Sequence, residues 1–399
     1  MADVTDVIVV GGGPAGMMTG LLFARAGVRT TVLEKHGDFL RDFRGDTVHP
    51  STLDLFDELG LLDALLDQPH DKVDDIAAVI GGRAWPIADF THLPGRGKFI
   101  AMMPQWHFLS FVAEAAGKYP AFDLRMETEG VALIEEGGRV TGVRTATGDE
   151  LHGRLVILAD GRNSKLRGAA GLPLEDLGAP IDVFWFRVPK ARTPTNDTQG
   201  YIANGEMVVG IDRGDYFQCA RVIEKGAADV VEAKGIERFR ADVVRAAPVL
   251  AEGVEALKSF DDIKLLTVSL DRLTRWYRPG LLAIGDAAHA MSPVGGVGIN
   301  LAIQDAVAAA NILAGPMAQG ANPDPILAQV QARRMFPVKV IQGIQRIAHR
   351  NVIGAALGGR VNDAPLLLRM LSRFPVLQRI PARVLGLGVR REHIRSPAA

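Results

Sequence analysis

Cysteine is nearly absent from this chain: Cys219 is the one cysteine among 399 residues. A single cysteine excludes an internal disulfide and a cysteine-ligated metal cluster, and it fits a reducing compartment. The formal net charge is −1, without the basic excess that a nucleic-acid partner requires. These absences predict a cytoplasmic protein that binds no metal ion and no nucleic acid.

Long apolar runs are absent as well. No uninterrupted run approaches the ~20 residues that a membrane-spanning helix needs. Asp3 and Asp6 precede the first apolar run, where a targeting segment would carry positive charge. We therefore expect neither a signal peptide nor a transmembrane segment. The 48% of hydrophobic and 23% of charged residues are typical of a globular protein with two or three domains.

The amino terminus carries a βαβ pattern. Residues 6–10 form a β-branched run typical of a buried parallel strand, and residues 14–26 have apolar side chains at helical spacing. Residues 30–33 then predict a second strand, so the whole unit fits within ~30 residues. This is the arrangement of a dinucleotide-binding unit.

A glycine fingerprint lies inside this unit. Gly11 permits a tight turn, Gly13 lets backbone N–H groups approach a pyrophosphate, and Gly16 lets helix and strand pack closely. Glu34, about 20 residues further on, can accept hydrogen bonds from a ribose diol and would repel a 2′-phosphate. The site therefore suits an ADP moiety without that phosphate, which both FAD and NAD contain.

A second ligand-binding turn is predicted far along the chain. Residues 281–284 form a short apolar strand that ends at Gly285-Asp286, and a loop rich in proline and glycine leads to an apolar helix that opens near Asn300. A carboxylate at the strand end can bind hydroxyl groups, and a helix amino terminus can stabilise negative charge. From these residues alone, an acidic helix cap remains an alternative.

Two further segments carry polar residues at expected turns. Arg44 precedes a predicted helix and could bind a diphosphate, although a solvated arginine is an equal alternative. Asp160-Gly161 follows an apolar strand at 155–158, and an ordinary strand-to-helix turn is the alternative there.

The rest of the chain predicts three further regions. Residues 122–159 alternate as a β-meander, and residues 183–186, 207–211 and 216–222 predict strands of a mostly antiparallel insertion. From residue 300 onward the pattern is helical, with a helix end or kink expected at Pro337, Pro375 and Pro381. The predicted domains are a discontinuous dinucleotide-binding domain (1–75, 101–180 and 266–332), a β-sheet substrate domain (76–100 and 181–265) and C-terminal helices (333–399).

These motifs, taken in order, resemble the class A flavoprotein monooxygenases, the para-hydroxybenzoate hydroxylase-like group. The match covers roughly residues 5–315: GGGPAG at 11–16, Glu34, Arg-Gly at 44–45, DGRNSKLR at 160–167 and GDAAHAMSPVGGVGIN at 285–300. The resemblance implies an α/β fold, in which a Rossmann-like FAD-binding domain carries an inserted, mostly antiparallel β-sheet domain and a helical C-terminal region.

The resemblance also assigns cofactor-binding residues by position. Around the ADP half of FAD it places Gly11, Gly13, Pro14, Ala15, Gly16, Glu34 and Lys35. It places Arg44 at the diphosphate, Gln105 beside the ribityl chain, Asp160-Gly161 at FAD and NAD(P)H, and Asp286 at the ribityl or pyrophosphate group. The flavin-lining segment is Pro293, Gly295, Gly296, Val297, Gly298, Ile299 and Asn300. No side chain is singled out as catalytic.

The implied reaction is a hydroxylation. NAD(P)H would reduce FAD, O2 would form a flavin hydroperoxide, and one oxygen atom would pass to an apolar aromatic, polycyclic or quinone-like molecule. The alternative is a flavin-dependent reductase or dehydrogenase that acts on an unsaturated lipophilic substrate without inserting oxygen.

The sequence pattern assigns the residues that contact the substrate less clearly than those that bind the cofactor. Phe184 and Phe186 alternate with Trp185 along one strand, so only one set can face the flavin. His49 is one of several candidate partners for a phenol proton, and His289 is expected to be a packing residue. The C-terminal region, rich in leucine and arginine, predicts helices that pack on the FAD domain, and weak peripheral contact with a membrane remains open. The pattern does not indicate an oligomeric state.

Overall fold

The amino-terminal βαβ unit forms the centre of a six-stranded sheet in the computed structural model, which describes residues 5–40, 46–190, 198–358 and 364–399. The strand order is β20-β21-β12-β1-β2-β8, and all neighbours are parallel except β20 and β21. In that order the strands are Tyr277–Arg278, Leu281–Ala283, Leu155–Leu158, Val7–Val10, Thr30–Leu33 and Phe122–Arg125. The predicted α/β, Rossmann-like fold is confirmed.

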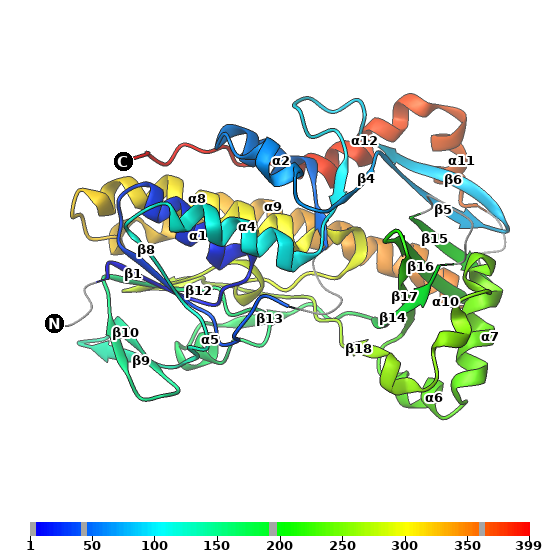
Figure 1. Ribbon diagram of the computed structural model, residues 1–399, viewed down its shortest axis with the longest axis horizontal. Helices are drawn as coiled ribbons and strands as arrows, with labels where there is room; N and C mark the ends of the chain where they lie inside the picture. The colour runs from blue at the N-terminus through cyan, green and yellow to red at the C-terminus, as the bar shows by residue number, and fades with distance from the viewer. Residues whose placement is uncertain (1–4, 41–45, 191–197, 359–363) are drawn as a thin grey trace.

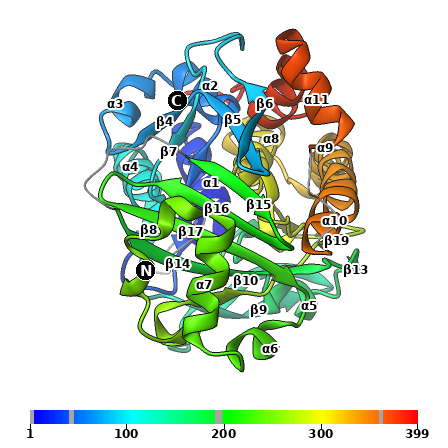
Figure 2. The same cartoon turned by 90° about the vertical axis from the view of Figure 1, so that its right-hand side faces the viewer.

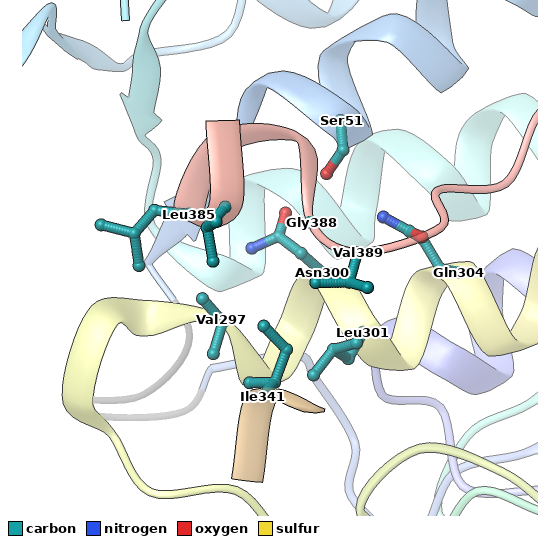
Figure 3. A pocket seen from close by; sticks show the side chains of 10 residues that line it. Ser51, Val297, Asn300, Leu301, Gln304, Ile341, Leu385, Gly388 and Val389 are labelled. Carbon is teal, nitrogen blue, oxygen red and sulfur yellow. The ribbon is translucent and has the colours of Figure 1, made fainter. Parts of the chain in front are cut away.

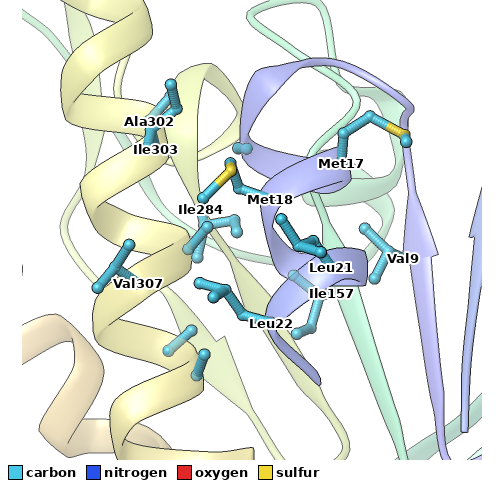
Figure 4. Close-up of a cluster of buried hydrophobic side chains, with 14 of the residues drawn as sticks. Val9, Met17, Met18, Leu21, Leu22, Ile157, Ile284, Ala302, Ile303 and Val307 are labelled. Carbon is cyan, nitrogen blue, oxygen red and sulfur yellow. The ribbon is translucent and has the colours of Figure 1, made fainter. Parts of the chain in front are cut away.

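Helices cover this sheet and exclude water from it. Helix α1 (Pro14–Arg25) packs beside α8 (Gly298–Ala318), and α4 (Gln105–Gly117) lies against α1 (Figure 1). The close-up in Figure 4 shows Met18 and Leu22 of α1 facing Ile303 and Val307 of α8. A three-stranded sheet that includes β10 (Arg139–Thr145) contacts β12 on the opposite side (Figure 1). The central strands are therefore buried on both faces, which explains why they read as continuous apolar runs.

Helix α8 owes its apolar composition to this packing. Among the residues that the structure describes, the stretch Val294–Ala318 has the length and hydropathy of a membrane span, and 78% of its most apolar window is buried inside the protein. Helix α9 (Leu327–Ala348) packs against α8. The stretch is therefore a core helix of the FAD-binding domain.

The predicted meander is wrong in its extent. Only β9 (Gly130–Glu136), β10 (Arg139–Thr145) and β11 (Glu150–His152) form an antiparallel sheet. The flanking strands β8 and β12 pair in parallel with β2 and β1 instead. Short turns join the middle three strands, whereas the two flanking ones extend the hydrophobic parallel sheet.

A seven-stranded sheet stands beside the FAD-binding domain (Figure 1). Its order is β18-β14-β17-β16-β15-β5-β6, antiparallel throughout except for the parallel pair β15 and β5. The strands are Lys264–Leu266, Ile181–Pro189, Tyr216–Glu224, Glu206–Asp212, Gln199–Ala203, Asp75–Ile80 and Arg83–Asp89. Two segments separated by 91 residues, between Asp89 and Ile181, thus share one sheet, while the domain boundaries given above stay a prediction.

The outer face of this sheet is covered by α7 (Ile236–Ala246), as Figure 2 shows. Phe184 and Phe186 point toward α7, with ring centroids 5.7 and 5.3 Å from the ring of Phe239. Trp185 lies on the opposite face, in one cluster with Met207, Val209 and Val294. Strand alternation therefore leaves Trp185 and its neighbours on the side that faces the FAD-binding domain.

Several short helices follow α9. They are a π-helical turn (His349–Ile353), α10 (Gly354–Leu357), α11 (Leu366–Arg373), α12 (Arg379–Ala382) and a second π-helical turn (Arg383–Leu387). Pro375 follows the end of α11 as expected, but Pro337 lies inside α9 and does not end it. Pro337 is buried, so packing of α9 against its neighbours compensates for the lost backbone hydrogen bond.

Candidate FAD-binding and oxygenation site

The fingerprint glycines occupy the turn between β1 and α1. Gly11 has φ +108°, and a Cβ atom on it would lie 2.4 Å from the Ala159 carbonyl oxygen. A Cβ atom on Gly16 would lie 1.9 Å from the Gly11 carbonyl oxygen. Both positions therefore require glycine for the turn itself and for its packing against the end of β12.

Gly13 differs from these two because no described part of the protein requires it. Its φ of −74° and ψ of −177° suit any residue, and no heavy atom of the described residues lies within 4 Å of a Cβ built on it. Gly13 is also the N-cap of α1, where backbone N–H groups and the helix dipole favour an anion. The open space beside Gly13 fits a pyrophosphate that approaches the backbone closely.

Glu34 holds the fingerprint loop from the end of β2. Its Oε2 accepts a hydrogen bond from the Gly12 N–H at 3.0 Å, and its Oε1 accepts one from the His36 N–H at 3.0 Å. Glu34 is only 6% exposed, and Lys35 beside it is exposed. Glu34 thus stands at the end of β2 beside the fingerprint loop, where a ribose diol was predicted to bind.

The distant motifs meet at this turn. A Cβ atom on Gly285 would lie 3.0 Å from Cβ of Ala15 and 3.1 Å from Cβ of Ala302, so the GDAAH segment packs directly between α1 and α8. A Cβ atom on Gly11 would lie 2.8 Å from the Asp160 nitrogen. The structure thus brings residues 11–16, 160–161 and 285–286 to one edge of the parallel sheet, where its strands end.

Asp160 has a buried oxygen that no protein group satisfies. Its Oδ1 has no hydrogen-bond partner among the described residues. Burial raises the pKa of Asp160, although Ser164 and the positive charges of Arg167 and Lys35 act in the opposite direction. A buried acceptor without a donor is costly, so this atom fits a hydroxyl or N–H donor from a ligand.

Asp286 forms an ion pair that the sequence did not reveal. Arg162 Nη2 donates to Asp286 Oδ2 at 3.0 Å, and the two side chains are 19% and 27% exposed. Arg162 belongs to the DGRNSKLR segment and brings a cation to the same edge as Asp286. Arginine binds phosphate oxygens well, so Arg162 adds a diphosphate-binding candidate.

The predicted flavin-lining loop is tied to β3 (Thr47–Val48). Thr47 Oγ1 donates to the Gly296 carbonyl at 2.9 Å. Asn300 Oδ1 accepts from the His49 N–H at 3.0 Å, while its Nδ2 donates to the Thr47 and Gly296 carbonyls at 3.3 and 3.4 Å. Helix α8 begins at Gly298, two residues before the expected start. The Asn300 side chain therefore fixes the loop from within.

His49 is buried and neutral at physiological pH. Burial lowers its pKa to about 4, despite a hydrogen bond to the Leu385 carbonyl at 2.7 Å. Its Nε2 has no partner among the described residues. His49 can therefore act as a hydrogen-bond acceptor, but no contact in the structure assigns it to a substrate.

Gln105 opens α4 next to a second buried ion pair. Burial raises the pKa of Asp46, which the Arg213 charge and the Gln105 N–H counteract. Arg213 Nη2 lies 2.6 Å from Asp46 Oδ2 and comes from the turn between β16 and β17. This pair, which no sequence pattern indicated, joins the seven-stranded sheet to the FAD-binding domain. Arg44 lies outside the described residues.

The GDAAH segment rests on a buried carboxylate. Asp305 accepts from the Gly285 N–H at 3.0 Å and from Arg334 Nε at 2.8 Å, and its Oδ2 lies 2.5 Å from His289 Nε2. Arg334 Nη1 also contacts Glu392 at 3.3 Å, and Asp305 and Arg334 are fully buried. His289 is thus a packing residue, as expected, and its partner Asp305 is one that the sequence analysis missed.

The charges around Asp305 decide how it titrates. Burial acts to raise the pKa of Asp305, but His289 and Arg334 hold it below the ordinary value of 3.8. The ionised Asp305 therefore contributes its full stabilisation of the folded protein above pH ~4. This contribution is lost as the pH falls through the pKa that Asp305 has in the folded state.

A small cavity lies behind the flavin-lining loop (Figure 3). Its volume is about 10 Å³, and Ser51, Asn300, Gln304 and Leu385 are among the residues that line it. That volume holds about one water molecule. It is therefore too small for an aromatic substrate.

Comparison with known proteins identifies the family. A family described as an FAD binding domain matches residues 4–343. The chain belongs to this FAD-binding family. It is 32% identical over 388 residues to 6-methylpretetramide 4-monooxygenase from Streptomyces rimosus, and the match covers 95% of this chain and 92% of that protein. Rifampicin monooxygenase from Streptomyces venezuelae is 28% identical, with 75% of this chain and 62% of that protein covered.

Solved structures agree with the fold. PqsL of P. aeruginosa in complex with 2-aminobenzoylacetate matches with a TM-score of 0.77 and 22% identity, over 90% of this chain and 98% of that chain. The predicted membership in the class A flavoprotein monooxygenases, the FAD cofactor and the enzyme class are confirmed. The individual cofactor-binding residues remain predictions, with which the open space at Gly13 and the unpartnered Asp160 oxygen are consistent.

Gly13→Val tests the pyrophosphate position. The valine should weaken FAD binding about ten- to a hundredfold, because overpacking of a close contact costs about 1–3 kcal/mol. Fluorescence titration of the apoprotein with FAD measures the effect. Gly117→Val is a matched control, since Gly117 also has no neighbour within 4 Å. Unchanged FAD affinity in Gly13→Val would place the cofactor elsewhere.

Asp305→Asn tests the carboxylate beneath the GDAAH segment. Breaking a buried ion pair leaves Arg334 undercompensated and should lower the free energy of unfolding by about 3–5 kcal/mol. Denaturant titration of the flavin-loaded protein measures this change. Asp63→Asn, which breaks an exposed pair with Arg96, should change stability little. Equal stability of the two variants would show that the network does not support the segment.

Proposed function

We propose that this FAD-dependent monooxygenase hydroxylates a fused polycyclic phenol, with NAD(P)H as reductant and O2 as oxidant. One observation supports the proposal. The match to 6-methylpretetramide 4-monooxygenase, whose name states its substrate, extends over almost the full length of both proteins. A quinone-like substrate is the second candidate within the same chemistry. We place the enzyme in the cytoplasm, where NAD(P)H is available.

The residues of the chain have four tasks in this reaction. The Gly13 backbone and the amino terminus of α1 would hold the pyrophosphate, and Glu34 would hold the adenosine ribose. Asp160, Asp286 and Arg162 would bind the polar chain between the two ends of FAD. The loop at Gly295–Gly298 would present backbone N–H groups to the flavin ring. When bound, FAD supplies the oxygen-activating chemistry.

The sheet face with Trp185 forms the proposed substrate wall. Trp185, Met207 and Val209 cluster with Val294 of the flavin-lining loop, so an apolar molecule held between them would lie beside that loop. Trp185 Nε1 is buried without a hydrogen-bond partner among the described residues. A buried indole N–H usually has a partner, and a substrate carbonyl or phenol oxygen would provide one.

Water exclusion follows from the same arrangement. The candidate wall is apolar, and the loop opposite is fixed by the hydrogen bonds of Thr47 and Asn300 to Gly296. A dry, fixed site favours transfer of oxygen to the substrate over loss as hydrogen peroxide.

The first test is the reaction itself. Purified flavin-loaded enzyme should consume NAD(P)H faster when fused-ring phenols are added, and the product should contain one oxygen atom derived from labelled O2. Mass spectrometry of the product and a peroxide assay separate hydroxylation from wasted reduction of O2. Product formation under strict anaerobiosis would favour the reductase alternative, and no stimulation by any phenol or quinone would refute the proposal.

The second test is Trp185→Phe. Losing one neutral hydrogen bond should raise KM about three- to tenfold and change kcat little, because such a bond contributes about 0.5–1.5 kcal/mol. Steady-state kinetics with the identified phenol measure both constants. Phe186→Leu, at the next position on the opposite face, should lower stability and leave KM unchanged. A KM effect shared by both variants would remove the role assigned to the indole N–H.

A further inference from the structure

The C-terminal helices carry a group of large apolar side chains exposed to solvent. Helix α11, the turn that follows it and α12 form the outermost corner of the molecule beside β5 and β6 (Figure 1). Exposed fractions reach 75% for Leu366, 66% for Leu367 and Val376, and 62% for Ile380. With Met370 and Phe374, these six residues form what we call the α11–α12 patch. Contiguous apolar surface of this kind marks an interaction site.

The patch is a defined face of a packed helix. Leu366 and Met370, four residues apart, lie on one side of α11, and Phe374 follows as its C-cap. Leu371 on the inner side is buried, and both α11 and α12 contact β6. Ala382 and Leu387 belong to a buried cluster with Phe90. The inner side therefore attaches the helices to the sheet, and among the residues that the structure describes the outer apolar side chains stay exposed.

Positive charge surrounds the patch. Residues 364–391 contain six arginines and no acidic residue, in a chain whose formal net charge is −1. Arg369, Arg373, Arg379 and Arg383 are exposed. Among the described residues, Asp89 at the end of β6 brings a carboxylate near this group, and it interacts with His92 and Arg379. The patch is thus apolar at its centre and cationic at its border.

We propose that the α11–α12 patch docks on an anionic lipid surface. Apolar side chains on one face of a helix, bordered by arginines, match a bilayer interface, where acyl chains accept the former and lipid headgroups pair with the latter. A second copy of this chain, whose formal net charge is −1, would offer little negative charge to pair with the arginines. It therefore explains the positive border of the patch less well than an anionic lipid surface does. The docked surface would give the enzyme access to lipophilic phenols or quinones dissolved in the membrane.

Vesicle binding of the full flavin-loaded enzyme tests the proposal. The enzyme should co-sediment with phosphatidylcholine vesicles that contain phosphatidylglycerol, bind pure phosphatidylcholine vesicles weakly, and dissociate as salt rises. Leu366→Ser combined with Phe374→Ser should lower the partition coefficient more than tenfold. Arg373→Gln combined with Arg383→Gln should lower it roughly twenty- to thirtyfold.

Matched controls separate the patch from general surface changes. Val230→Ser with Leu265→Ser removes apolar side chains that are 61% and 43% exposed elsewhere. Lys118→Gln with Lys234→Gln removes two exposed cations. Both controls should bind vesicles like the unchanged enzyme. FAD content and NAD(P)H oxidation with a water-soluble phenol should stay normal in all four variants, so a failed reaction and failed docking are distinguishable.

Three outcomes would overturn the proposal. The first is equal binding to neutral and anionic vesicles, and the second is binding that the patch variants do not weaken. The third is a dimer, seen by light scattering, that dissociates in the Leu366→Ser and Phe374→Ser variant while vesicle binding is absent. That result would assign the patch to a second copy of the chain.

Discussion

A carboxylate that water cannot reach holds the cofactor end of this enzyme together. Asp305 binds the Gly285 N–H, His289 and Arg334 at once, and therefore fixes where β21 ends and where Asp286 stands. Gly285 in turn packs between Ala15 and Ala302, so the position of Asp286 depends on the packing of α1 against α8. The position of the GDAAH segment accordingly depends on the packing of α1 against α8 as much as on the residues of the segment itself.

The two ends of the candidate site use glycine for different reasons. Gly11 and Gly16 are glycine because neighbouring backbone leaves no room for a Cβ atom, while Gly13 is glycine beside empty space. The first kind of requirement belongs to the fold and the second to a ligand. A similar distinction applies to the carboxylates, because Glu34 already binds backbone N–H groups whereas Asp160 retains an oxygen without a partner.

Local patterns were sufficient to predict the βαβ unit, three strands of the inserted sheet (β14, β16 and β17) and the turns at residues 11–16, 160–161 and 285–286. Each of those features depends on residues within about 30 positions of one another. Residue type and spacing along the sequence are therefore enough to indicate it. Asp305, Arg334 and Glu392 could not be found in this way, because the ion pair of Arg334 with Glu392 joins helix α9 to a non-helical segment 58 residues further on. Strand alternation separated Trp185 from Phe186, but only the position of α7 decides which of them faces inward. Pro337 was expected to end or kink a helix, and it lies inside α9 without ending it, because tertiary packing overrode a local preference.

Residues 285–305 cannot reach their final arrangement until residue 392 has left the ribosome, because Arg334 is held between Asp305 and Glu392. The fingerprint at residues 11–16 is synthesised nearly 400 residues earlier and must wait for these partners, and the parallel pairing of β5 with β15 imposes a similar delay. Contacts of such long sequence separation form slowly. We therefore expect FAD to be incorporated late in the biogenesis of this enzyme, after both sheets have formed.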